Sequence, residues 1–246
     1  GCLSNARMPE IKGLDRFKGK VFHTGHWPHE PVDFTGQRVA VIGTGSSGIQ
    51  SVPLIAEQAR YLTVFQRTAN FSIPARNAKL SAEERAWFRK NYAEVRRFAR
   101  EEGRGGIYMD LPDRGALDDG DNQRHARYET QWERGGLTFM TTYTDLLVDP
   151  TANDTAADFV RAKIAALVED KATANLLQPN SHPIGTKRIC IDTDYFATFN
   201  RPNVELVDIK ANPIQEITEN AVRVAGKEHE VDAVVLATGF DAMTGS

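Results

Sequence analysis

The residues with the clearest chemical potential form a glycine-rich run between two apolar stretches. Arg38–Ile42 is short, apolar and β-rich, and the run GTGSSG follows it at residues 43–48. A second apolar, β-rich stretch covers residues 62–65. Between them, apolar residues recur at helical spacing at Ile49, Val52, Ile55, Ala56 and Ala59. The order strand, G-x-G-x-x-G, helix and strand is typical of the unit that binds a dinucleotide.

Each glycine of this run has a physical role in such a unit. Gly43 permits a tight turn, Gly45 lets the backbone approach a pyrophosphate, and Gly48 lets the helix pack closely on the strand. Unpaired N–H groups and the macrodipole at the start of the helix favour phosphate. A glycine-rich loop without a ligand is the alternative, but the flanking pattern favours a dinucleotide. The predicted binding residues are Gly43, Gly45, Ser46, Ser47 and Gly48.

The end of the second strand indicates which cofactor is bound. Sites for NAD or FAD usually have Asp or Glu here, because a carboxylate accepts hydrogen bonds from the ribose hydroxyls. This chain has Arg67 and Thr68 instead. A guanidinium can bind a 2′-phosphate with two parallel hydrogen bonds, and the threonine hydroxyl can donate a further one. A solvated surface arginine is the alternative reading, and NADP(H) is the prediction.

Composition limits the other classes of function. The chain has 246 residues and a net charge of −3, which gives no reason to expect a nucleic-acid or membrane partner. No apolar run is long enough to span a bilayer, and no signal peptide is visible. Cys2 and Cys190 do not have the spacing of a disulfide framework, which favours the reducing environment of the cytoplasm as the location of the protein. The chain starts without Met and stops just after an apolar stretch, so we expect a segment of a larger protein.

The elements that must position these residues indicate an α/β protein. We predict a Rossmann-like, doubly wound parallel sheet with a β-hairpin or meander and a large helical insertion. Residues 1–37 are expected to be a linker, 38–77 and 181–246 the nucleotide-binding domain, and 78–180 the insertion. Asp232 to Ala237 is predicted to be a buried parallel strand, which would bring Thr238 and Gly239 near the cofactor. Helices are predicted from a capping box at Ser81 onward and at 125–134, 137–148, 152–168 and 172–177.

Three histidines near the N-terminus raise the question of a metal site. His23, His26 and His29 are spaced three residues apart. No second group of ligands accompanies them, the intervening Gly and Pro argue against one helical face, and zinc sites favour other spacings. No metal is therefore predicted.

The same region resembles a known family. The order F-x-G-x-x-x-H-x-x-x-W-P at residues 17–28, placed before the glycine-rich run, resembles the fingerprint of Baeyer–Villiger monooxygenases. Further matching motifs are GTGSSGIQ at 43–50, FQRT at 65–68, GTKR at 185–188 and ATGFD at 237–241. Ala69 departs from the pattern, since the family commonly has Pro there. The fingerprint residues are Phe17, Gly19, His23, Trp27 and Pro28.

The resemblance implies roles for particular residues. It adds Thr44 and Gln50 to the cofactor-binding residues, and it implies that Lys187 helps Arg67 and Thr68 to hold the 2′-phosphate. Arg188 is implied as the catalytic residue that stabilises the negatively charged oxygenated flavin. Without the resemblance, Lys187 and Arg188 would equally be read as two surface cations. His23 and Trp27 are expected to couple the NADP domain to an FAD domain.

The resemblance also implies a reaction and its partners. Family members use NADPH, FAD and O2 to convert a ketone into an ester or lactone. This chain contains one G-x-G-x-x-G and no separate FAD fingerprint, so we expect an NADP-binding domain whose partner is the FAD domain of the same protein. Alone, it should bind NADP(H) without oxygenating ketones.

Two alternatives remain open from the sequence. One is the NADPH domain of an N-hydroxylating or flavin-containing monooxygenase, whose fingerprint usually ends differently from Trp27-Pro28. The other is a non-catalytic nucleotide-binding module with a sensing or scaffold role. Titration with NADPH, NADH and FAD tests the cofactor assignment, and binding of FAD alone would rule that assignment out.

Overall fold

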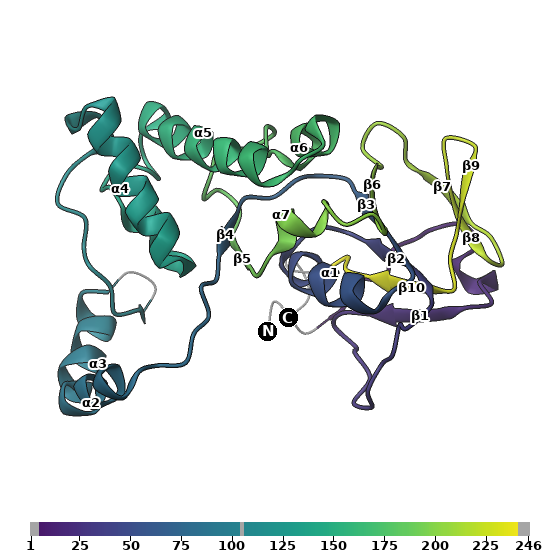
Figure 1. The fold of residues 1–246 in the computed structure, drawn as a ribbon, viewed down its shortest axis with the longest axis horizontal. Helices are drawn as coiled ribbons and strands as arrows, with labels where there is room; N and C mark the ends of the chain where they lie inside the picture. The colour runs from purple at the N-terminus through teal and green to yellow at the C-terminus, as the bar shows by residue number, and fades with distance from the viewer. Residues whose placement is uncertain (1–4, 104–105, 241–246) are drawn as a thin grey trace. The chain divides into compact units, whose positions relative to one another are not determined.

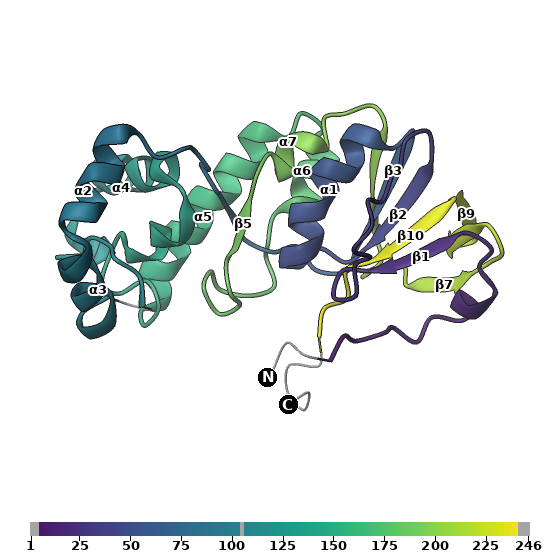
Figure 2. The same cartoon turned by 90° about the horizontal axis from the view of Figure 1, so that it is seen from below.

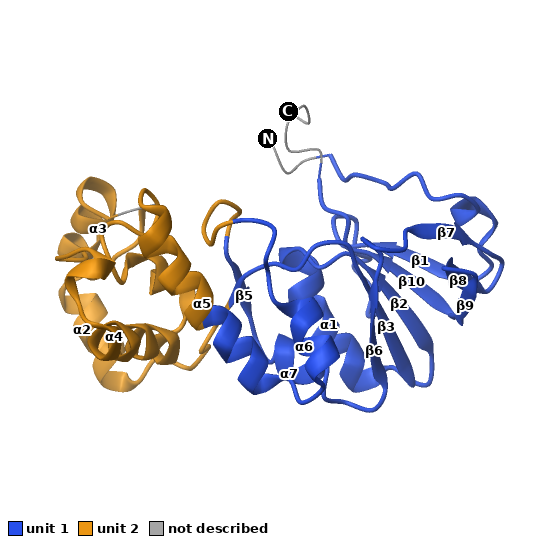
Figure 3. Ribbon diagram, turned by 90° about the horizontal axis from the view of Figure 1, so that it is seen from above, with its two compact units in different colours: residues 1–72, 160–182, 189–246 blue, residues 73–159, 183–188 orange. Residues whose placement is uncertain are grey.

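A computed structural model of the chain describes residues 5–103 and 106–240. It divides into two units, coloured separately in Figure 3. Unit 1 comprises residues 1–72, 160–182 and 189–246, and unit 2 comprises residues 73–159 and 183–188. Within the described residues, no helix combines the length and the apolar character needed to cross a membrane.

Unit 1 is built on a parallel sheet of five strands (Figure 1). In spatial order the strands are β1 (Lys20–His23), β10 (Ala233–Leu236), β2 (Arg38–Ile42), β3 (Tyr61–Gln66) and β6 (Val204–Asp208). All neighbouring strands pair in parallel, and all four residues of β10 are buried. An α/β fold with a buried parallel strand at β10 is therefore confirmed.

The two faces of this sheet are covered differently. On one face, α1 (Ser46–Gln58) lies against β2 and β3 and contacts α7 (Tyr195–Thr198). On the other face lies an antiparallel meander of β7 (Ile214–Ile217), β8 (Ala221–Val224) and β9 (Lys227–Glu230). Figure 2 shows β7 and β9 on the side of the sheet away from α1. Apolar residues of β2 and β10 cluster with those of the meander at Ala40, Ile42, Val234, Leu236, Ile217, Val222 and Val224. The predicted β-hairpin is confirmed by the antiparallel β7–β8 pair, whose strands are joined through Glu219-Asn220.

A short two-stranded sheet also belongs to the structure. It pairs β4 (Ser72–Pro74) with β5 (Cys190–Asp192). Inside unit 1, the Ser72 hydroxyl donates to the buried Asp192 carboxylate at 2.5 Å, and Asp192 accepts the N–H of Tyr195 at 3.2 Å. The strand β5 and the short helix α7 therefore share Asp192 as a buried anchor.

The helices of the middle third begin with a pair in unit 2 that contains no buried residues. They are α2 (Ala82–Lys90) and α3 (Tyr92–Glu101). The predicted capping box is confirmed: the Ser81 side chain accepts the N–H of Glu84, and the Glu84 carboxylate accepts the N–H of Ser81. Further along come α4 (Asp121–Arg134), α5 (Pro150–Leu167) and α6 (Lys171–Leu177), with α5 running across the boundary of the two units.

One predicted helix is wrong. Residues 137–148 form only the 3-10 helix η4 (Gly136–Thr141), followed by turns. Gly135 and Gly136 have φ values of +72° and +75°, so the backbone reverses before this segment instead of entering an α-helix. The apolar periodicity there serves aromatic packing, because Phe139 stacks on Tyr128 and Phe159.

Candidate functional site

The predicted cofactor residues of unit 1 gather at one edge of the parallel sheet. His23 pairs in register with Leu236, Leu236 with Ile42, and Ile42 with Phe65. Because the strands are parallel, the residues that follow β2, β3 and β10 all emerge at the carboxyl edge. These are the glycine-rich run 43–48, Arg67 with Thr68, and Thr238 with Gly239.

Two glycines of the run are required by the fold itself. Gly43 has φ +109°, and a Cβ placed on it would lie 2.5 Å from the carbonyl oxygen of Ala237. A Cβ on Gly48 would lie 2.2 Å from the carbonyl oxygen of Gly43. Gly43 thus makes room for the end of β10, and Gly48 makes room for the turn. No larger residue fits at either position without displacing backbone.

Gly45 differs from both, and its difference points to a ligand. It has φ −80° and ψ −172°, which is extended backbone that any residue adopts. A Cβ placed on it would meet no atom of the chain within 4 Å. Nothing in the described fold requires glycine here, so the open space beside Gly45 is available to a group from outside the chain.

The start of α1 presents unpaired N–H donors beside that space. Gly45 is the N-cap, and no side chain caps this end of the helix within the described structure. The N–H of Ile49 donates to the Gly45 carbonyl at 2.9 Å, so the N–H groups of residues 46–48 precede the first helical hydrogen bond. Ser46 and Gln50 are both exposed. The side-chain amide of Gln50 is already used within the chain, because it donates to the Ile191 carbonyl at 3.2 Å. This end of α1 therefore has the donor set of an anion site.

Arg67 and Thr68 come directly after β3 on the same edge. Arg67 is exposed, and within the described part of the chain it forms no ion pair or side-chain hydrogen bond. The Thr68 carbonyl accepts the Thr44 hydroxyl at 3.0 Å, and the Asn70 amide donates to the Thr44 carbonyl at 2.7 Å. Asn70 has no recognisable sequence signal beyond its position three residues after Arg67.

The fingerprint residues pack around β1. A Cβ on Gly19 would lie 2.6 Å from the Phe17 ring and 2.3 Å from the carbonyl oxygen of Asp232. Glycine at this position therefore lets the ring lie against the chain that enters β1. Trp27 is 38% exposed, and its ring lies 5.4 Å from that of Phe22. The partly exposed Pro28 follows it.

His23 lies in a directional chain of hydrogen bonds at the end of β1. It is 5% exposed, and its Nδ1 accepts the N–H of Gly25 at 3.0 Å. Its Nε2 lies 3.2 Å from Thr238 Oγ1, which donates to the Arg7 carbonyl at 2.7 Å. Since that hydroxyl has one proton, Nε2 must be the donor to Thr238, which assigns the Nε2–H tautomer. His23 thus links β1, the turn after β10 and the incoming chain at Arg7.

The turn after β10 is tied to the start of the described chain. The N–H of Arg7 donates to the Gly239 carbonyl at 2.9 Å, and Ala6 pairs with Phe240 in an antiparallel bridge. Gly239 has φ +78°, a conformation that favours glycine. The ATGFD motif ends at Asp241, which lies outside the described residues.

Lys187 and Arg188 belong to unit 2, where both are exposed. Within that unit the preceding segment is anchored by the buried Asn153. Its Nδ2 donates to the carbonyls of Leu146 and Ile184 at 2.7 Å each, and its Oδ1 accepts the N–H of Ile184 at 3.1 Å. The roles of Lys187 and Arg188 toward a nucleotide stay predictions.

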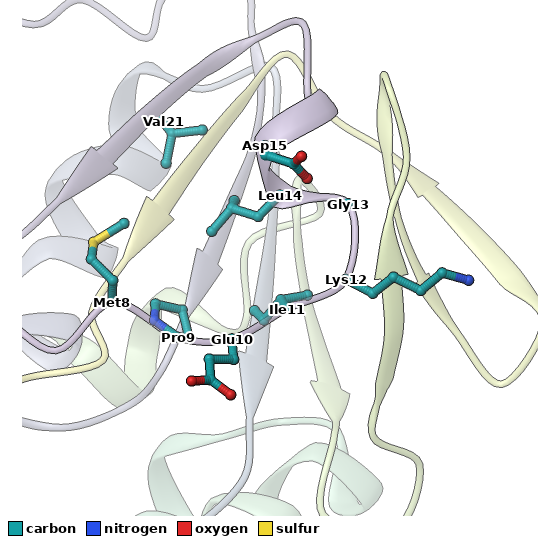
Figure 4. A pocket seen from close by; sticks show the side chains of 9 residues that line it. All are labelled: Met8, Pro9, Glu10, Ile11, Lys12, Gly13, Leu14, Asp15 and Val21. Atoms are coloured by element: carbon teal, nitrogen blue, oxygen red, sulfur yellow. The ribbon is translucent and has the colours of Figure 1, made fainter.

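An open groove of about 650 Å³ lies elsewhere in unit 1, beside β1 (Figure 4). None of the predicted cofactor residues lines it, and it lacks the donor set found at α1. The candidate site is therefore assigned to the carboxyl edge of the sheet. The groove is lined by Met8, Pro9, Glu10, Ile11, Lys12, Gly13, Leu14, Asp15 and Val21.

Comparison with known proteins gives consistent matches. Residues 1–78 match the family described as FMO-like, flavin-binding monooxygenase-like. The whole chain aligns with a Baeyer–Villiger monooxygenase of Pseudooceanicola batsensis at 39% identity and with a phenazine N-monooxygenase of Lysobacter antibioticus at 40% identity. It also aligns, at 53% identity and a TM-score of 0.95, with a structure of oxidized steroid monooxygenase bound to NADP. It covers 45% of each of the two sequences and 47% of that structure, so it spans about half the length of these relatives.

Proposed function

The chain is homologous over its full length to Baeyer–Villiger monooxygenases, and we propose that it is the NADP(H)-binding part of such an enzyme. The observation that carries the proposal is the open space beside Gly45, next to the uncapped start of α1. A fold that needs no glycine at that position, yet has one between two essential glycines, is suited to a phosphate held close to the backbone.

The donor set fits a dinucleotide with a 2′-phosphate. The N–H groups of residues 46–48 would hold the pyrophosphate, with the Ser46 and Ser47 hydroxyls as further donors. Arg67 and Thr68 would hold the 2′-phosphate, since Arg67 is exposed without a carboxylate partner in the described structure. By resemblance alone, Gln50, Lys187, Thr238 and Gly239 are proposed as further cofactor-binding residues and Arg188 as the catalytic residue.

Bound NADPH supplies a hydride, and the protein supplies position and charge. The sheet edge would hold the two phosphate groups at a fixed separation and so orient the rest of the cofactor. The His23 chain of hydrogen bonds would keep the turn after β10 in place against the segment at Arg7. We assign His23 a positioning role, because both ring nitrogens already have partners in the chain.

For the whole protein we propose oxidation of a ketone to an ester or lactone with O2, NADPH and FAD. FAD would be bound mainly by a further domain of the same protein, which would be the partner of this one. The chain alone is then expected to bind NADP(H) and not to oxygenate. We further propose a cytoplasmic location, consistent with Cys190 being a buried thiol.

A second candidate reaction is N-oxygenation. It is favoured by the 40% identity to a phenazine N-monooxygenase, which is close to the identity with the Baeyer–Villiger relative. The two candidates share the NADP(H) site and differ in the substrate oxidised. Product analysis of the whole protein with a cyclic ketone and with an aromatic N-heterocycle would separate them.

Calorimetric titration of the purified chain tests the part that both candidates share. NADPH should bind with one site per chain, NADH should bind at least about tenfold more weakly, and FAD should give no saturable heat. Binding of FAD in preference to NADPH would overturn the cofactor assignment. Equal affinity for NADPH and NADH would remove the 2′-phosphate contact from the proposal.

A further inference from the structure

Thr44 joins the glycine-rich loop to the segment that follows β3. The Thr44 residue is only 5% exposed, although Ser46, two positions on, is exposed. Thr44 Oγ1 donates to the Thr68 carbonyl at 3.0 Å, and Asn70 Nδ2 donates to the Thr44 carbonyl at 2.7 Å. The two bonds run in opposite directions and close a ring between the segments. We call Thr44, Thr68 and Asn70 the loop clamp.

The loop clamp begins where the backbone pairing of the sheet ends. The N–H of Gly43 donates to the Phe65 carbonyl at 3.0 Å, and the Gln66 carbonyl accepts the N–H of Ile209 at 2.9 Å. Beyond Gln66 the chain leaves the ladder. The loop clamp then supplies the hydrogen bonds that tie residues 67–70 to the glycine-rich loop. The backbone of Arg67 is thereby held between the end of β3 and a fixed Thr68 carbonyl.

We propose that the loop clamp is a specificity device, in which Thr44 and Asn70 act as positioning residues for recognition of the 2′-phosphate. This inference rests on the proposed NADP(H) site. The buried Thr44 hydroxyl is already used in the chain, so Thr44 acts on the nucleotide through Thr68 and Arg67. The family resemblance had placed Thr44 among the cofactor-binding residues.

The physical reason is preorganisation. NADPH carries two anchoring groups, the pyrophosphate and the 2′-phosphate, whereas NADH carries only the first. A site in which residues 67–70 are already fixed relative to α1 loses less conformational entropy when it binds both groups. Loss of the loop clamp should therefore weaken NADPH more than NADH. One net hydrogen bond of ordinary strength corresponds to roughly three- to tenfold in the ratio of the two Kd values.

The experiment compares Kd values for NADPH and NADH by calorimetry in matched variants of the chain. Thr44→Val removes the hydroxyl and keeps the shape, Thr44→Ser keeps the hydroxyl, and Asn70→Ala removes the amide donor. Ser51→Ala is the control, because Ser51 donates to the Ser47 carbonyl at 2.6 Å within α1 and forms no side-chain hydrogen bond to residues 67–70 in the described structure. Thermal midpoints of all variants are measured alongside, so that binding is compared between folded proteins.

The expected result is a selective loss. Thr44→Val and Asn70→Ala should each raise the Kd for NADPH about three- to tenfold and leave the Kd for NADH within about twofold. Thr44→Ser and Ser51→Ala should keep the wild-type ratio. Equal weakening of both nucleotides, or an unchanged ratio in both clamp variants, would overturn the inference.

Arg67→Ala in the same series separates this inference from the proposed function. If Arg67→Ala removes the preference for NADPH while Thr44→Val and Asn70→Ala keep it, the loop clamp fails and the site stands. If Arg67→Ala also leaves the preference intact, the 2′-phosphate contact itself fails, and the inference about the loop clamp fails with it.

Discussion

Gly45→Ala separates what the fold requires from what a ligand requires at the same loop. The backbone of Gly45 is extended, and a Cβ there would meet no atom of the chain within 4 Å. Alanine is a poorer N-cap than glycine, but it also reduces the entropy of the unfolded chain, and the two effects nearly offset each other. The free energy of unfolding should therefore change by less than about 1 kcal/mol.

Nucleotide binding should respond very differently. The new methyl group would occupy the space through which a pyrophosphate reaches the N–H groups of residues 46–48. Forcing one methyl group against rigid neighbours costs about 1–3 kcal/mol, which corresponds to roughly 5- to 150-fold in Kd. Both quantities can be followed in one preparation, with thermal unfolding for stability and calorimetry for NADPH.

Gly48→Ala provides the comparison. Its Cβ would lie 2.2 Å from the carbonyl oxygen of Gly43, and backbone on both sides must move to relieve the overlap. We expect a loss of about 3 kcal/mol or more in unfolding free energy, with a lowered thermal midpoint. The reasoning is refuted if Gly45→Ala binds NADPH with the wild-type Kd, or if Gly48→Ala unfolds at the wild-type temperature.

Two further predictions concern stability. Burial lowers the pKa of His229, against the opposing effect of the Glu205 carboxylate 3.4 Å away, so the unfolded state takes up the proton first. The unfolding free energy should therefore decrease as the pH falls below about 6.5. In His229→Gln, the unfolding free energy from urea denaturation should depend less steeply on pH in this range. Equal pH dependence in the variant and the wild type would contradict this. Asn153→Ala removes the side chain that hydrogen-bonds the buried carbonyls of Leu146 and Ile184 and the N–H of Ile184. This substitution should destabilise unit 2 by about 2–4 kcal/mol and speed hydrogen exchange at the Ile184 amide. Unchanged exchange would show that Asn153 does not anchor this segment.

The part of the fold best predicted from the sequence is the β2–α1–β3 unit. Its strands are buried on both faces and read as continuous apolar runs, while its helix shows a clear apolar period. The glycines at 43 and 48 are required by local geometry, so their spacing signals the turn directly. Local pattern and tertiary structure agree here, and the prediction therefore holds.

Prediction failed where tertiary packing determines the local structure. Residues 137–148 have apolar residues at nearly helical spacing, but the positive φ of Gly135 and Gly136 and the burial of Phe139 among other rings produce a 3-10 helix and turns. The short helix α7, which the sequence pattern did not predict, has only four residues, so its own sequence carries little periodicity.

The candidate site shows the same division. Gly45 and Arg67 could be predicted as candidate residues, because a motif marks the first and the end of a strand marks the second. Asn70 could not, because its partner Thr44 lies 26 residues earlier and contributes only a backbone carbonyl. The orientation of the Thr44 hydroxyl toward Thr68 was likewise hidden, since a threonine in a glycine-rich loop is equally compatible with a direct ligand contact. Side-chain direction in such a loop depends on the neighbouring segment, which the local pattern does not specify.

The most direct test of the central claim is the nucleotide preference of Arg67→Ala against that of Arg60→Ala. Arg60 lies at the opposite end of β3, where its N–H donates to the Gln37 carbonyl at 2.9 Å, so it serves as a matched control. At low ionic strength, Arg67→Ala should weaken NADPH by roughly tenfold or more, because a charge-assisted bond to phosphate is lost. It should leave NADH within about twofold, and Arg60→Ala should change neither. Equal losses for the two nucleotides, or none for either, would contradict the assignment of an NADP(H) site to this edge of the sheet.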